Sequence, residues 1–130
     1  MLISKKILST IVLSTALIFS ASANAAKKPK LCKEFSDSNC VLKSEYYENM
    51  YEKIIAKVKQ DIAKNPEDEH AKEFLEYAEA LHNAAEKYCN FTLSTYYHGN
   101  QLSENDWYQC QSKQYEDLME KKILPYADNY

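Results

Sequence analysis

The chain has 130 residues and a formal net charge of −3, with 19 acidic residues against 16 basic ones, all of them lysine. Arginine makes the bidentate contacts to phosphates and base edges, so an acidic chain without arginine argues against nucleic-acid binding. The single glycine also excludes a glycine-rich phosphate-binding loop.

Residues 1–25 have the features of a secretory signal peptide. Two lysines precede an apolar stretch over residues 7–20, and the tripeptide Ala-Asn-Ala at 23–25 supplies a cleavage pattern of small residues. About 14 apolar residues are too few for a membrane span, which takes about 20. We therefore predict cleavage after Ala25, a periplasmic or secreted protein, and no stable membrane insertion after cleavage.

Residues 26–130 then form one small domain, in which residues 26–31 are expected to be a flexible lead. All four cysteines lie in this part of the chain. An even number of cysteines in a small exported domain favours disulfide bonds, although sequence alone allows three pairings. A four-cysteine zinc site normally has closely spaced pairs, and no such pairs are present.

Residues 41–64 have apolar positions three and four residues apart, which is the period of one helix face. The positions on this stripe are Tyr47, Tyr51, Ile54, Ile55, Val58 and Ile62. Asn65 as a cap and Pro66 at the first helical position predict that a second helix begins here. We expect this helix to extend as far as Tyr97, with an apolar stripe of Phe74, Ala78, Leu81, Ala85 and Tyr88.

A helical hairpin is predicted between Cys89 and Cys110. Gly99 is typical of a helix stop, and Ser103 followed by Asp106 has the form of an N-terminal capping box. The two cysteines lie ten residues before and eleven residues after Gly99, so a rise of about 1.5 Å per residue places them at one height. This geometry favours a Cys89–Cys110 disulfide and leaves Cys32–Cys40 as the second.

The third helix is expected to begin near Glu104 and to end at Pro125. Its inward-facing positions are Trp107, Cys110, Tyr115, Leu118 and Ile123. The sequence thus predicts an all-α three-helix bundle with a long antiparallel helical hairpin, stapled by two disulfides.

Candidate chemistry is sparse. His82 and Glu86 are four residues apart, a spacing that could hold a metal, but no second histidine joins them at helical spacing and a surface polar pair is favoured. No pair of carboxylates has a sequence pattern that indicates general acid–base catalysis. The cysteines are expected to form disulfides, so they are not available as nucleophiles. We predict no catalytic, cofactor-binding or metal-binding residues, no cofactor, and no enzymatic activity.

The chain has eleven tyrosines and one tryptophan, which either pack in the core or form a binding surface. Tyr51, Tyr88, Trp107 and Tyr115 are interpreted as core residues because of their helical spacing. The candidate partner contacts lie instead at the hairpin tip, where packing partners run out. They are Tyr96, Tyr97, His98 and Asn100.

Three stretches resemble the LprI-type lysozyme inhibitor N-terminal domain. They are Cys40 with the following Glu-Tyr-Tyr-Glu-Asn-Met-Tyr-Glu-Lys-Ile segment, Leu75 to Cys89, and Gly99 with Cys110 to Leu118. Leu81 and Ala85 stand where the family usually has a tryptophan and an arginine.

The resemblance implies a small exported helical protein that binds a protein partner. Lysozyme, a cationic cell-wall hydrolase, is the partner implied, and an acidic, tyrosine-bearing surface suits a cationic enzyme. The alternative is a periplasmic interaction, immunity or envelope assembly protein without lysozyme activity.

Overall fold

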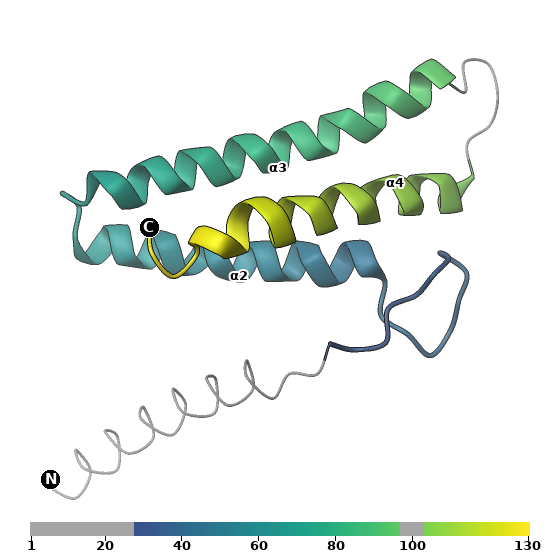
Figure 1. Cartoon of the computed structure of the whole chain (residues 1–130), viewed down its shortest axis with the longest axis horizontal. Helices are drawn as coiled ribbons and strands as arrows, with labels where there is room; N and C mark the ends of the chain where they lie inside the picture. The colour runs from purple at the N-terminus through teal and green to yellow at the C-terminus, as the bar shows by residue number, and fades with distance from the viewer. Residues whose placement is uncertain (1–27, 97–102) are drawn as a thin grey trace, which may run out of the picture. The chain divides into compact units, whose positions relative to one another are not determined.

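The computed structural model describes residues 28–96 and 103–130, which form three α-helices that run alongside one another in alternating directions (Figure 1). Every pair of helices is in contact. The predicted all-α bundle with two disulfides is confirmed. The predicted leader over residues 1–25 lies outside the described residues. The elements are α2 (Lys43–Lys64), α3 (Glu69–Tyr96), α4 (Glu104–Asp117), a π-helix η1 (Leu118–Ile123) and a 3₁₀-helix η2 (Leu124–Tyr126).

The core is formed by one face of each helix together with η1. Its fully buried side chains include Tyr47 and Val58 from α2 and Met119 and Ile123 from η1. The stripe predicted on the first helix is confirmed, since its six members are all buried or packed against the core cluster. In the described residues, no helix combines the length and the apolar character that a membrane crossing requires.

The start of α3 differs from the prediction. Asn65 and Pro66 lie in a turn, closed by the Asp68 backbone N–H donating to the Asn65 carbonyl at 3.1 Å. The helix begins at Glu69, and Asp68 caps it because its Oδ1 accepts a hydrogen bond from the Ala71 N–H at 3.0 Å. Asparagine followed by proline is equally typical of the first two positions of a β-turn, and that tendency prevails here.

Tyr88 is a second difference, because half of it is exposed rather than in the core. The buried face of α3 passes through Ala78, Ala85 and Cys89. Cys89 must face α4 to reach Cys110, so its predecessor along the helix is turned about 100° away, toward solvent.

The capping box at the start of α4 is confirmed. The Ser103 side chain accepts a hydrogen bond from the Asp106 N–H, and the Asp106 carboxylate accepts one from the Ser103 N–H. Trp107 is only partly buried, and the neighbouring Tyr108 occupies the buried position instead.

The helix does not continue to Pro125 with α-helical geometry. It widens at Leu118 into η1, where the Leu124 N–H donates to the Met119 carbonyl five residues earlier. This wider turn places both Leu118 and Met119 in the core, together with Ile123. Pro125 lies within η2, so the chain stays helical in character past the expected end.

Both predicted disulfides are present, and they include all four cysteines. Cys89–Cys110 joins α3 to α4 with Cα atoms 5.8 Å apart, and Cys32–Cys40 closes a short loop with Cα atoms 5.1 Å apart. Within the short loop Asn39 has a φ of 59°, a left-handed conformation that asparagine tolerates better than most residues.

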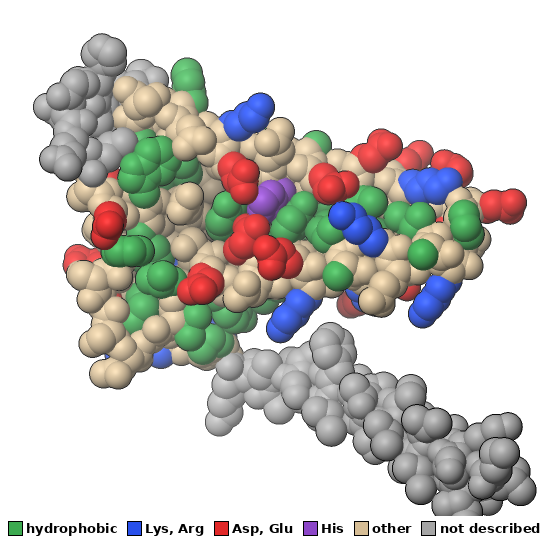
Figure 2. All heavy atoms as spheres, turned by 180° about the vertical axis from the view of Figure 1, so that it is seen from behind, with side chains coloured by type: hydrophobic (Ala, Val, Ile, Leu, Met, Phe, Trp, Pro, Cys, Tyr) green, Lys and Arg blue, Asp and Glu red, His purple; other side chains and the backbone are tan. Residues whose placement is uncertain are grey.

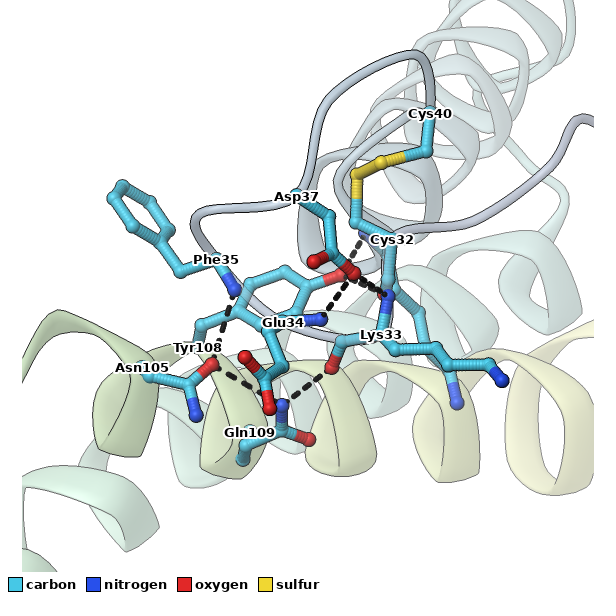
Figure 3. The surroundings of a disulfide bond; sticks show 10 residues. Cys32, Lys33, Glu34, Phe35, Asp37, Cys40, Asn105, Tyr108 and Gln109 are labelled. Carbon is cyan, nitrogen blue, oxygen red and sulfur yellow. Dashed lines mark hydrogen bonds between the residues drawn. A yellow bond between two sulfur atoms is a disulfide. The ribbon is translucent and has the colours of Figure 1, made fainter.

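The Cys32–Cys40 loop is fastened to the beginning of α4 (Figure 3). The Tyr108 hydroxyl donates to the Cys32 carbonyl at 2.6 Å and accepts from the Lys43 N–H at 2.8 Å, at the start of α2. Asn105 Oδ1 accepts from the Phe35 N–H at 3.0 Å, and Gln109 donates to the Lys33 carbonyl. One tyrosine therefore connects the loop, α2 and α4.

The opposite end of the bundle is closed without cysteines. The ring of Tyr130 stacks on Phe74 with centroids 4.9 Å apart, and its hydroxyl donates to Asp61. Tyr77 of α3 donates to the Lys122 carbonyl at 2.9 Å and packs edge-on against Tyr126. The last residues of the chain thus cover the end of the core.

Candidate functional site

The predicted partner contacts cannot be placed. Tyr96 is the last residue of α3, and its side chain is not among those described. Tyr97, His98 and Asn100 lie in residues 97–102, outside the described residues. Their role at the hairpin tip therefore stays a prediction.

The described residues bring together a different group, centred on His82. Its imidazole ring lies between two tyrosine rings, parallel to Tyr51 of α2 at a centroid distance of 4.1 Å and to Tyr115 of α4 at 5.6 Å. Both tyrosines are buried, as predicted from their spacing. The three helices each supply one ring, so the stack fixes the plane of the imidazole.

Carboxylates occupy both nitrogen edges of this ring. His82 Nε2 lies 2.9 and 2.7 Å from the two oxygens of Glu48, and Nδ1 lies 3.7 Å from Glu86 Oε1. The histidine side chain is only 15% exposed, whereas that of Glu86 is 49% exposed. We refer to Glu48, His82 and Glu86 as the histidine cluster.

Sequence reasoning found only part of this cluster. The spacing of His82 and Glu86 predicts a polar pair, but Glu48 lies 34 residues earlier in the chain, on another helix. Glu48 and Tyr51 are three residues apart, so both can face the same neighbouring helix. This spacing is the one sequence signal that could have placed Glu48 near His82. It can be used only when the helix that packs against Glu48 and Tyr51 is known.

The tyrosines of the stack remain protonated at neutral pH. Burial, reinforced by the negative charges of Glu79, Glu48 and Glu86, raises the pKa of Tyr51 to about 12. Burial together with the charges of Glu48 and Glu86 raises the pKa of Tyr115 as well. The Tyr115 hydroxyl donates to Glu86 Oε1 at 3.5 Å, which steadies the more exposed carboxylate.

Figure 2 shows the molecule from behind, with acidic and hydrophobic side chains interspersed on this face around a histidine. Helix α3 carries five glutamates and two lysines. Its glutamates are all exposed, at Glu69, Glu73, Glu76, Glu79 and Glu86. We call these five residues the acidic stripe.

Exposed aromatic residues flank this stripe on the same helix. Tyr77, Tyr88 and Phe91 are exposed, Phe91 to 70%. Tyr77 also lines a cavity of about 300 Å³ at the end closed by Tyr130, together with His70, Glu73, Phe74, Tyr126 and Asn129. The surface of α3 thus combines negative charge with aromatic contact area.

No protein-family model, no curated protein and no solved structure matches this chain. The likeness to the LprI-type domain therefore rests on the sequence segments quoted above.

Proposed function

We propose that the protein is an exported binding protein that occludes a cationic cell-wall hydrolase of the lysozyme type. The observation that carries the proposal is the acidic stripe of α3 with its exposed aromatic neighbours. Negative charge attracts a basic enzyme and speeds encounter, and aromatic side chains provide contact area at small cost in conformational entropy.

Two further features support the exported setting. Both disulfides are formed, and disulfides persist in oxidising compartments such as the periplasm and the extracellular medium. The sequence pattern over residues 1–25 is that of a signal peptide. An exported protein is in the compartment where cell-wall hydrolases act.

The direct test is a lysis assay on cell-wall substrate with several types of lysozyme and with the oxidised protein. We expect dose-dependent inhibition that weakens as salt is added, because attraction between exposed charges is screened at high ionic strength. The triple variant E69Q/E73Q/E76Q removes three charges of the acidic stripe and is expected to weaken inhibition by about tenfold.

A matched control is E34Q/E45Q/E52Q, which removes the same number of exposed charges from residues that are distant from α3 in sequence. It should inhibit nearly as well as the parent protein. Equal weakening in both triple variants would mean that net charge, and not the acidic stripe, attracts the enzyme. Variants Y96A and Y97A then test whether the hairpin tip contributes as predicted.

Absence of inhibition with every lysozyme type would reject the lysozyme proposal. The alternative of an immunity or envelope assembly protein would then be pursued by cross-linking in the periplasm.

A further inference from the structure

Three side chains of metal-ligating type converge in the histidine cluster. Their ligand atoms, one from each of Glu48, His82 and Glu86, all lie within 4.8 Å of one another. His82 and Glu86 are one helical turn apart on α3, and Glu48 reaches them from α2. The cluster therefore depends on the tertiary packing of two helices.

The histidine ring is already oriented for such a role. Tyr51 and Tyr115 stack on its two faces, so rotation of the ring away from the carboxylates would disrupt both contacts. The Tyr115 hydroxyl lies beside the Glu86 carboxylate. An oriented ligand supported by hydrogen bonds and packing is what a metal site requires around its ligating residues.

Binding of an ion requires movements of the two carboxylates. A tetrahedral zinc ion bonds imidazole nitrogen and carboxylate oxygen at about 2.0–2.2 Å, which holds two ligand atoms about 3.3 Å apart. His82 Nε2 and the nearer Glu48 oxygen are 2.7 Å apart, a hydrogen-bond distance, so Glu48 has to draw back to admit the ion. Glu86 faces the other ring nitrogen, Nδ1, at 3.7 Å, and its half-exposed side chain has to swing toward the ion.

We propose that Glu48, His82 and Glu86 form a binding site for a divalent transition-metal ion such as Zn²⁺. One imidazole and two carboxylates suit zinc better than the all-oxygen sets of calcium and magnesium. The three residues leave a fourth position for water. All four cysteines are in disulfides and do not compete for the ion.

The site shares Glu86 with the acidic stripe, so it is tested by metal binding in the absence of any lysozyme. Zinc chloride is titrated calorimetrically into oxidised, tag-free protein at neutral pH in a chelator-free buffer. We expect saturation at one ion per chain. Substitution of Co²⁺ should give visible absorption bands, which report coordination by protein ligands.

The Zn²⁺ affinity of variants tests which residues bind the ion. H82A removes the central ligand and should lower the Zn²⁺ affinity by at least about 100-fold, since even residues that only hydrogen-bond to a metal ligand typically contribute about 10–100-fold. E86Q keeps the shape of a half-exposed side chain, so it should fold normally and lower the affinity by about tenfold or more. The control H70A removes an exposed histidine that has a single carboxylate, Glu73, at 4.0 Å, and should bind Zn²⁺ like the parent.

Circular dichroism in the presence of EDTA establishes that each variant is folded. The proposal is overturned by absence of saturable 1:1 binding to the parent protein. It is overturned equally by a folded E86Q variant that binds Zn²⁺ as tightly as the parent, or by H70A losing as much affinity as H82A.

Discussion

The two ends of the bundle are closed by different chemistry. At the disulfide end, Cys89–Cys110 joins α3 to α4, and the Cys32–Cys40 loop is held by Tyr108. At the tail end no cysteine is present, and Tyr130 covers the core by stacking on Phe74 and donating to Asp61. The disulfide end thus responds to reductant, whereas the tail end depends on a titratable phenol.

The largest effect is expected from removing the covalent link at the disulfide end. The double variant C89S/C110S should lose about 3 kcal/mol of unfolding free energy, because the closed loop of 21 residues no longer restricts the unfolded chain. Its thermal midpoint should fall by more than about 10 °C. Urea and thermal unfolding followed by circular dichroism measure both quantities.

The matched control is C32S/C40S, whose loop spans only eight residues. The chain-entropy model gives it a smaller loss, about 2.5 kcal/mol. A larger loss in C32S/C40S than in C89S/C110S would contradict the assignment of the hairpin link as the main staple.

A smaller effect is expected from Y108F, which leaves the ring and removes one hydroxyl at the disulfide end. The Lys43 N–H and the Cys32 carbonyl each lose their hydrogen bond to that hydroxyl. We expect a loss of about 1–3 kcal/mol, the cost of leaving buried polar groups unsatisfied. Amide hydrogen exchange should show faster exchange at Lys43. Exchange at Lys43 equal to that of the parent would contradict the bridging role of Tyr108.

The smallest effect concerns pH at the tail end. Burial, the hydrogen bond to Asp61 and the nearby charges of Asp61, Asp68 and Asp128 raise the pKa of Tyr130 to about 12 from an ordinary value of 10.0. Below pH 10 the phenol is protonated in both states and its contribution to stability is complete. Between pH 10 and 12 the unfolded chain releases the proton that the folded chain retains, so stability falls as pH rises.

The variant Y130F cannot release this proton and should lose less stability between pH 10 and 12 than the parent. Urea midpoints measured at intervals across this range give the two slopes. The slope should not disappear, because burial raises the pKa values of Tyr47, Tyr51 and Tyr115 as well. Identical slopes for parent and variant would show that Tyr130 does not contribute.

Much of the fold could be predicted because its signals are local. The apolar stripe of α2 and the capping box of Ser103 and Asp106 are each contained within a few residues. The Cys89–Cys110 pairing followed from equal distances along two antiparallel helices, which the loop position alone determines.

The errors arose where two local signals compete or where a partner is distant. Asn65 and Pro66 suit a turn as well as a helix start, and the carboxylate of Asp68 provides the cap. Tyr88 fits an apolar stripe, but the disulfide determines which face of α3 turns inward at that level. Glu48 meets His82 only after α2 and α3 have packed, a contact that no periodicity encodes.

The bridge made by Tyr108 also bears on how the chain acquires its structure. Leu42 provides no side-chain cap for α2, and the first N–H of that helix is satisfied by a hydroxyl 65 residues further along the chain. During synthesis this hydrogen bond can form only after α4 has emerged and docked. A contact of such long sequence separation slows folding but makes it cooperative, so we expect the first and last helices to complete their structure in one step.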